Sequence, residues 1–277
     1  MTNPGTASTS QKNADFWNEL CGSQLAKSLG IHDSSPESLK RFDDWYFDIY
    51  PYLFEHIRFS ELRGNNVLEI GLGYGTVSQR LAVSGARYTG LDIAMGPVDM
   101  VNHRLRQSNL AGQATQGSIL DPPFAPDSFD VIVAIGALHH TGDLRQAIAQ
   151  CHRLLRSGGR LIFMVYYAYS YRRFLQVPRA TITYLVREQL GFRGCVGLST
   201  ERERAAYDAG SSGEGAPHTD WISVRSLKHY CEMFSSFSSK LENIDQEPPF
   251  RHTSRQALLK TRWPALFGLD LYATATK

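Results

Sequence analysis

Short apolar runs alternate with helically spaced stretches between Asn66 and Val165, and this rhythm limits the folds open to the chain. Such alternation is typical of βαβ units, which assemble a parallel sheet with right-handed crossovers. The runs at 129–135 and 161–165 are almost continuously apolar, as expected of central strands covered on both faces. Residues 62–165 are therefore predicted to form an α/β core, with strands at 67–70, 87–91, 114–116, 129–135 and 160–165.

The sequence on either side of this core divides into further parts. Residues 1–13 are polar and predict a disordered tail, whereas 14–61 carry apolar and aromatic residues at helical spacing and predict an N-terminal helical cap. Residues 166–220 break the alternation, opening with an aromatic-rich run and closing with the Gly- and Ser-rich stretch 209–217, so we expect a lid insert over a substrate site. Residues 221–277 resume the pattern and are expected to complete the sheet.

Composition limits the partners of the chain. Its 29 basic and 27 acidic residues nearly balance, which leaves no broad basic face, so no nucleic-acid partner is expected. No apolar run approaches the roughly 20 residues of a transmembrane helix, and 1–13 lacks an apolar signal region, so we predict a cytoplasmic protein. The four cysteines are widely spaced without a CxxC pair, which argues against a metal site and against a disulfide framework. The oligomeric state is left open.

A glycine-rich turn connects the first predicted strand to a helix. Gly71, Gly73 and Gly75 give the order G-x-G-x-G, and glycine is needed where backbone turns sharply or lies against a ligand. Asp92 ends the next strand, where a carboxylate accepts hydrogen bonds from both ribose hydroxyls of an adenosine. Glu69 precedes the glycines; a carboxylate there suits a cationic amino-acid tail and opposes the pyrophosphate of a dinucleotide. The pattern therefore favours a sulfonium nucleoside over a nicotinamide cofactor.

These motifs resemble those of class I S-adenosylmethionine-dependent methyltransferases of the small-molecule type. Residues 69–75 (EIGLGYG) resemble the first motif of that family and 91–93 (LDI) the second. Residues 129–140 resemble its strand 4 segment, and 154–160 (LLRSGGR) the turn before strand 5. The resemblance implies a Rossmann-like, mostly parallel seven-stranded sheet with strand 7 antiparallel, and S-adenosyl-L-methionine bound across the carboxyl ends of strands 1, 2 and 4.

The resemblance also implies which residues contact this cofactor. The backbone at Gly71 and Gly73 would hold the methionine portion, Asp92 the ribose, and Ser118 with Ile119 the adenine. The family often carries an acid at the position of Ser118, although serine can still donate or accept a hydrogen bond. The full predicted cofactor-binding set is Glu69, Gly71, Gly73, Gly75, Asp92, Ile93, Ser118, Ile119 and Ala134.

Histidines are the candidate general bases. His139 and His140 follow the fourth strand, at the sheet edge where open α/β proteins bind ligands, and either a base or a structural cap fits that position. His218 lies two residues before Asp220 in the insert, so the two could form a base dyad that closes over the site, or an ordinary surface turn.

Tyrosines at the start of the insert are the candidate acceptor-binding residues. Aromatic faces stabilise a neighbouring cation such as a sulfonium, although alternate tyrosines also simply pack a lid. The predicted substrate residues are Tyr166, Tyr167, Tyr169 and Asp220. The following segment 174–192 is mildly amphipathic and basic, which fits a lid helix or contact with a lipid surface.

The sequence thus predicts O- or N-methylation of a small-molecule acceptor, in secondary or specialised metabolism. Such a transfer is an in-line displacement, which requires alignment and exclusion of water rather than a protein nucleophile. One alternative is a protein of the same fold that binds the cofactor without transferring methyl, as a cyclase, decarboxylase or scaffold. The segment 121–124 (DPPF) resembles the signature of DNA amino-methyltransferases, but it precedes the fourth strand, whereas that signature should follow it. A nucleic-acid methyltransferase is therefore disfavoured, as is a nicotinamide dehydrogenase.

Overall fold

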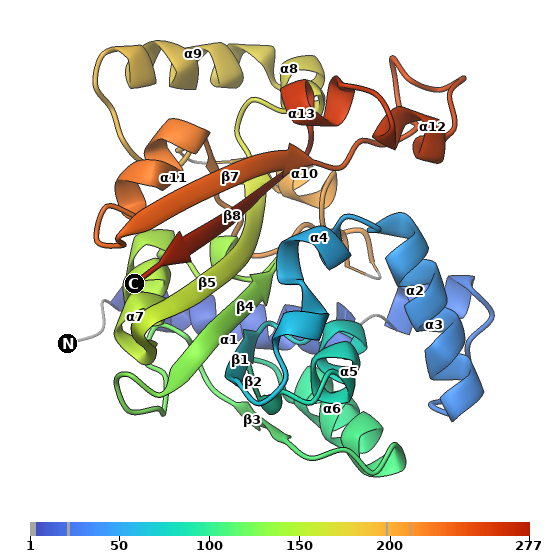
Figure 1. The fold of residues 1–277 in the computed structure, drawn as a ribbon. Helices are drawn as coiled ribbons and strands as arrows, with labels where there is room; N and C mark the ends of the chain where they lie inside the picture. The colour runs from blue at the N-terminus through green and yellow to red at the C-terminus, as the bar shows by residue number, and fades with distance from the viewer. Residues whose placement is uncertain (1–3, 21–22, 198, 211) are drawn as a thin grey trace.

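The computed structural model describes residues 4–20, 23–197, 199–210 and 212–277, arranged around one twisted sheet (Figure 1). The strand order is β3-β2-β1-β4-β5-β8-β7. Strands β1 to β5 pair in parallel, and β8 runs antiparallel to both of its neighbours, β5 and β7. The predicted fold class is confirmed, with β6 as a two-residue addition beside β5. The strands are β1 Asn66–Ile70, β2 Arg87–Asp92, β3 Gln113–Gln116, β4 Phe129–Ile135, β5 Leu155–Tyr167, β6 Trp221–Ile222, β7 Ser236–Glu242 and β8 Asp270–Thr276.

Helices cover both faces of this sheet because neighbouring residues of a buried strand point to opposite sides. On β1, Val67 packs in a core with residues of the helices α4, α5 and α6, whereas Leu68 packs in a second core with α7 and α11. On β4, Val131 and Ile132 divide in the same way. The helices are α1 Pro4–Leu20, α2 Ser23–Ser28, α3 Pro36–Ile49, α4 Leu53–Ile57, α5 Thr76–Val83, α6 Met95–Gln107, α7 Leu144–Leu154, α8 Tyr171–Gln176, α9 Pro178–Gln189, α10 Glu201–Ala205, α11 Val224–Tyr230, α12 Arg255–Leu259 and α13 Trp263–Phe267, with short 3-10 turns at Phe59–Glu61 and Leu138–His140.

The N-terminal region is more ordered than its composition suggests. Helix α1 begins at Pro4, inside the segment 1–13 that we expected to be a disordered tail, and residues 1–3 lie outside the described residues. The side chain of Asn13 is buried and donates a hydrogen bond to the carbonyl oxygen of His140, 2.6 Å away. This long-range contact holds α1 against the residues that follow β4. No local pattern in the sequence predicts it.

Strand β1 lies between β2 and β4, so the order of the strands changes direction there: β2 and β3 lie on one side of β1, and β4 and β5 on the other. Open α/β sheets bind ligands at such a point, outside the carboxyl ends of the strands. Within the described parts of the chain, no helix combines the length and apolar character of a membrane span, and no cluster of three metal-ligating side chains occurs. Cys151, Cys195 and Cys231 are free thiols, and Cys21 lies outside the described residues.

Candidate active site

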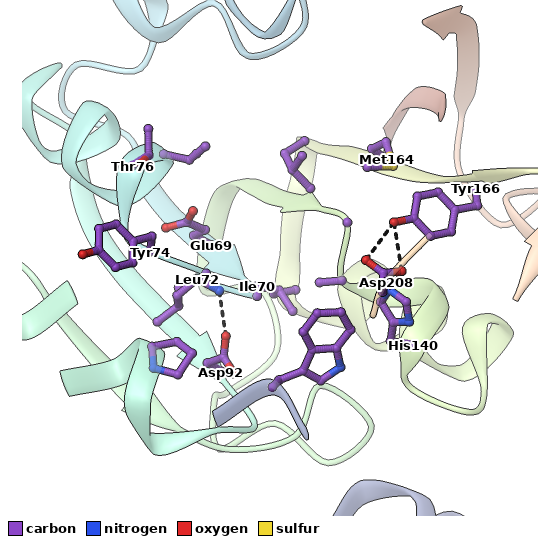
Figure 2. Close-up of a pocket in the computed structure, with 18 of the residues that line it drawn as sticks. Glu69, Ile70, Leu72, Tyr74, Thr76, Asp92, His140, Met164, Tyr166 and Asp208 are labelled. Atoms are coloured by element: carbon purple, nitrogen blue, oxygen red, sulfur yellow. Dashed lines mark hydrogen bonds and ion pairs between the residues drawn. The ribbon is translucent and has the colours of Figure 1, made fainter. Parts of the chain in front are cut away.

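A cavity of about 500 Å³ lies at the carboxyl ends of β1, β2, β4 and β5 (Figure 2). One part of its lining comes from the glycine-rich turn and the end of β2, including Glu69 and Asp92. Another part comes from the residues after β4, the end of β5 and the insert, including His140, Tyr166 and Asp208. Helices α1 and α3 contribute aromatic side chains to the same lining. The cavity therefore joins the predicted cofactor site to residues of the predicted substrate region.

The three glycines of the turn have positive φ angles, but for different reasons. A β-carbon on Gly71 would lie 2.3 Å from the Cβ atom of Ala137, so this position is restricted by the loop after β4. A β-carbon on Gly75 would lie 2.8 Å from Cδ of Arg104, and Gly75 is not part of the cavity lining. Gly71 and Gly73 both line the cavity, and a β-carbon on Gly73 would meet no atom of the described residues within 4 Å. Of the three, Gly73 is therefore the cavity-lining position at which no described side chain occupies the place of a β-carbon.

Asp92 is held rigidly at the cavity wall. Its Oδ2 accepts a hydrogen bond from the backbone N–H of Leu72 at 2.7 Å, and its Oδ1 accepts one from Ala94 at 2.9 Å. Burial raises the pKa of Asp92, while these backbone donors lower it. Each carboxylate oxygen retains a second acceptor site. Two fixed acceptors side by side suit the pair of hydroxyls on a ribose.

Glu69 lines the same end of the cavity and is nearly buried. Its Oε2 accepts hydrogen bonds from the hydroxyls of Ser78, at 2.5 Å, and Tyr88, at 2.7 Å. Burial raises the pKa of Glu69 to about 7. Since a nearby cation lowers the pKa of a carboxyl group, binding of an ammonium group here would favour the ionised form.

Ile93, Ser118 and Ile119, which we predicted to contact the cofactor, all line the cavity. The Oγ of Ser118 accepts a hydrogen bond from the backbone N–H of Leu120 at 3.2 Å, so it already serves the local turn. Ala134 is fully buried in the core beside β1 and does not line the cavity. Its predicted contact with the cofactor therefore lacks an accessible surface in this structure.

Asp43 on helix α3 connects this helix to the residues next to the glycine-rich turn. Asp43 accepts hydrogen bonds from both terminal nitrogens of the buried Arg104 at 3.0 Å each, and from the hydroxyl of Thr76 at 2.6 Å. The Arg104 guanidinium lies 5.5 Å from the centre of the Tyr74 ring, and Phe42 stacks against that ring at 4.2 Å. These contacts hold the helical cap on the cavity.

Helix α1 adds residues to the lining that the sequence did not single out. The Trp17 ring lies 4.7 Å from the imidazole of His140, measured between centroids. Asn13 donates to the His140 carbonyl through Nδ2, while its buried Oδ1 has no hydrogen-bond partner among the described residues. An amide oxygen in that state is available to a bound ligand.

The two adjacent histidines have different surroundings. His139 is fully buried, does not line the cavity, and packs against His140 and Tyr166 with ring centroids 4.1 and 4.3 Å away. Burial and the neighbouring His140 place the pKa of His139 well below its usual value, so its ring is neutral. His140 lines the cavity, and its Nδ1 is 2.7 Å from the carbonyl oxygen of His218. Because a carbonyl only accepts, Nδ1 carries the proton and Nε2 is the free base.

The Nε2 atom of His140 faces Asp208, whose Oδ2 lies 3.6 Å away. The hydroxyl of Tyr166 donates to both oxygens of Asp208, at 3.1 and 3.0 Å (Figure 2). Burial raises the pKa of Asp208 and lowers that of His140, while the two groups oppose these shifts in each other. The three residues form a polar cluster in the cavity wall, and the cluster can take up a proton.

The sequence did not identify Asp208 as a candidate site residue. This residue lies directly before the Gly- and Ser-rich stretch, and only the fold brings it to His140, which is 68 positions earlier. The predicted dyad of His218 and Asp220 does pair, with Nε2 and Oδ1 3.3 Å apart, but neither residue lines the cavity. Their backbones instead support the neighbouring histidines: the Asp220 N–H donates to the carbonyl of His139 at 2.8 Å.

Only one of the three predicted substrate tyrosines lines the cavity. Tyr166 lines the cavity, whereas Tyr167 and Tyr169 lie outside it and pack against each other with ring centroids 5.7 Å apart. The Tyr169 hydroxyl donates to Glu188 at 3.0 Å, so it serves the packing of α9. Alternate residues of β5 point to opposite faces, which explains why Tyr166 and Tyr167 differ.

Further polar residues line the cavity near Tyr166. Asp270 pairs with Tyr166 across β5 and β8, is almost fully buried, and accepts a hydrogen bond from Asn243 at 2.9 Å. Burial raises the pKa of Asp270 to about 7. Arg172 forms ion pairs with Asp245 at 3.0 Å and with Glu247 at 2.6 Å. This group therefore combines one buried acid, Asp270, with an arginine whose charge is balanced by two partly exposed acids.

The comparisons with known proteins agree with this geometry. Residues 68–163 match a sequence family described as a methyltransferase domain, and this segment holds the glycine-rich turn, Asp92 and His140. This segment is a class I S-adenosylmethionine-dependent methyltransferase domain. It covers β1 to β5, which build the part of the cavity that the cofactor motifs border.

Curated relatives match little more than a third of this chain. The ubiquinone biosynthesis O-methyltransferase of Pseudomonas syringae pv. tomato is 30% identical over 105 residues, which are 38% of this chain and 45% of the relative. The protein of the same name from Stutzerimonas stutzeri is 33% identical over 112 residues, 39% of this chain and 46% of the relative. The chain thus spans less than half the length of these relatives.

Solved structures resemble the methyltransferase domain together with much of the rest of the chain. The YcgJ protein of Bacillus subtilis has a TM-score of 0.53 at 19% identity and covers 82% of this chain and 98% of its own. A putative S-adenosylmethionine-dependent methyltransferase from Listeria monocytogenes has a TM-score of 0.54 at 17% identity, with 86% and 98% covered. The [4+2]-cyclase SpnF has a TM-score of 0.50 at 13% identity, with 80% and 79% covered. At such identities these likenesses establish the fold alone.

Proposed function

We propose that the chain transfers the methyl group of S-adenosylmethionine to an oxygen or nitrogen of a small-molecule acceptor. The observation that carries the proposal is the single cavity that joins Asp92 and the glycine-rich turn to the cluster of His140, Asp208 and Tyr166. One part of the lining suits an adenosine, and the other supplies a base. Specialised metabolism, a cytoplasmic location and the absence of a nucleic-acid partner remain part of this proposal.

The residues at the cofactor end have a positioning role. When bound, S-adenosylmethionine supplies a methyl group that its sulfonium leaving group already activates. Asp92 would accept hydrogen bonds from the ribose hydroxyls, and Gly73, which has no β-carbon, would let the methionine portion approach the turn closely. Trp17 and the helices α1 and α3 exclude water from the reacting atoms. Alignment of this kind can contribute several kcal/mol to the rate.

The residues at the acceptor end handle the proton. During the transfer, His140 would take the proton that the acceptor atom releases, with Asp208 as its partner. The His218 carbonyl holds Nδ1–H of His140, which leaves Nε2 as the site of protonation. Asp208 then stabilises the imidazolium, and Tyr166 keeps Asp208 in place.

Methyl transfer is tested with S-adenosylmethionine labelled in its methyl group. The purified protein is incubated with panels of phenols, carboxylic acids and amines, and labelled products are separated by chromatography. The proposal expects label in at least one acceptor class and its loss in Asp92→Ala. Incorporation into none of these classes, by a protein that binds the cofactor product S-adenosylhomocysteine, argues against methyl transfer.

A second candidate is an enzyme of the same fold that binds the cofactor without transferring methyl. The resemblance to the SpnF cyclase makes the fold compatible with this function, and it says nothing more. Labelled methyl in any product rejects it. Conversion of an added compound without label or S-adenosylhomocysteine formation would favour it.

A further inference from the structure

Helix α9 presents apolar side chains to solvent. Ile182, Val186 and Leu190 follow one another at four-residue spacing, so they form one stripe along the helix and its C-terminal residue. Their exposed fractions are 51%, 51% and 82%. The stripe continues on α8 with Leu175, which is 57% exposed. A surface helix of a globular protein normally places such residues against the core.

The opposite face of α9 is buried and polar, and this fixes the stripe outward. Glu188 is 4% exposed. It accepts hydrogen bonds from the hydroxyls of Ser226 at 2.9 Å and Tyr169 at 3.0 Å, and also from Ser223. Rotating α9 to bury the stripe would break these bonds and leave a carboxylate without partners, which is costly. The outward apolar face is therefore built into the fold.

Positive charge accompanies the stripe. Arg179 and Arg187 are exposed on α9, and the sole acidic residue between positions 171 and 197 is the buried Glu188. The nearby α13 adds three exposed apolar side chains, and Phe250 connects it to α8: its ring lies 5.4 Å from Tyr171 and 5.6 Å from Trp263. The segment 248–267 contains no acidic residue, and its exposed cations include Lys260 and Arg262. The apolar side chains of α13 are Trp263, Leu266 and Phe267.

We infer that the outer face of α8 and α9 docks onto an anionic lipid bilayer. An amphipathic helix with an apolar stripe and flanking arginines lies in the plane of a bilayer interface, with its cations on acidic headgroups. A second protein is not favoured, because the exposed charges beside the stripe, Arg179 and Arg187, are both positive and match the acidic headgroups of a bilayer. The inference does not depend on methyl transfer.

The test is flotation of the purified full chain with vesicles of phosphatidylcholine and phosphatidylglycerol at 3:1, compared with phosphatidylcholine alone. The wild type is expected to float with the anionic vesicles and to release at high salt. Arg179→Gln with Arg187→Gln should weaken partitioning about 10- to 30-fold. Ile182→Ser with Val186→Ser should weaken it at least tenfold, because several buried methyl and methylene groups are lost from the interface.

Matched controls lie at the other end of the molecule in Figure 1, on α5 and α6. Val83→Ser removes an apolar side chain that is 54% exposed, and Arg106→Gln removes an exposed cation; both should float as the wild type does. Circular dichroism melts establish that each variant is folded. Three results would overturn the inference: no flotation of the wild type, equal flotation with phosphatidylcholine alone, or flotation that survives both pairs of substitutions. Self-association that the stripe substitutions abolish, without vesicle binding, would also overturn it and assign the face to a second copy.

Discussion

Asp208→Asn tests the proton-accepting role of the cluster at the acceptor end. The substitution conserves shape, and the amide oxygen still accepts from the Tyr166 hydroxyl, so the local packing survives. What disappears is the negative charge 3.6 Å from Nε2 of His140. At an effective dielectric constant of about 20, that charge is worth about 4–5 kcal/mol to the imidazolium. Burial raises the pKa of Asp208, which opposes its charge and reduces the gain. We therefore expect a net loss of about 2–4 kcal/mol, or a kcat about 30- to 1,000-fold lower.

The pH profile separates this role from a purely structural one. Burial lowers the pKa of His140, and the charge on Asp208 raises it. Removing the charge lowers that pKa further, so the acidic limb of kcat against pH should move to lower pH in Asp208→Asn. Tyr166→Phe, which removes a single hydroxyl, should cost about tenfold. The assay is initial-rate methyl transfer from pH 5 to 9, with S-adenosylhomocysteine affinity measured in parallel. An unchanged kcat and profile in Asp208→Asn would refute the reasoning.

Other consequences concern stability. Gly71→Ala should lower the free energy of unfolding by well over 1 kcal/mol, because φ is positive and the new β-carbon would clash with Ala137. Gly158 also has a positive φ, but a β-carbon there would meet no described atom, so Gly158→Ala should lower that free energy by only about 1 kcal/mol. Equal losses for the two variants in urea titrations would contradict this reasoning. Asp43→Asn should lower the free energy of unfolding by about 3–5 kcal/mol, because it removes the carboxylate that balances the charge of the buried Arg104. A change in melting temperature of less than about 2 °C would contradict this. Burial raises the pKa of Glu69 to about 7, so between about pH 4.5 and 7 the folded state holds a proton that the unfolded state has lost. The free energy of unfolding should therefore fall as the pH rises through this range. Glu69→Gln should flatten that dependence in thermal melts of the ligand-free protein.

The cofactor end was largely predictable because its signals are local. A strand, a glycine-rich turn and a helix follow one another within 67–83, and Asp92 ends the next strand, which parallel pairing must place beside the first. Ser118 and Ile119 reach the cavity for the same reason. Gly75 and Ala134 were also predicted to contact the cofactor, but in this structure Gly75 packs against Arg104 and Ala134 lies in the core.

The acceptor end was predictable only in part because its contacts are long-range. Asp208 and Asn13 meet His140 through the tertiary fold, and no spacing in the sequence connects them. The pairing of His218 with Asp220 is local and was predicted, but its position relative to the cavity depends on how the insert folds back. The start of strand β7 has no clear signal in the sequence, because its first residues are mostly exposed serines rather than alternating apolar residues.

Calorimetric titration of S-adenosylhomocysteine into the wild type, Asp92→Ala and Asp99→Ala tests the central claim most directly. Asp99 is an exposed acid on α6, close in sequence and outside the cavity lining, so it controls for loss of charge alone. The account predicts micromolar binding to the wild type and Asp99→Ala, and binding at least tenfold weaker to a folded Asp92→Ala, which lacks the charged acceptor of the ribose hydroxyls. Absence of binding to the wild type, or equal affinity in Asp92→Ala, would contradict it.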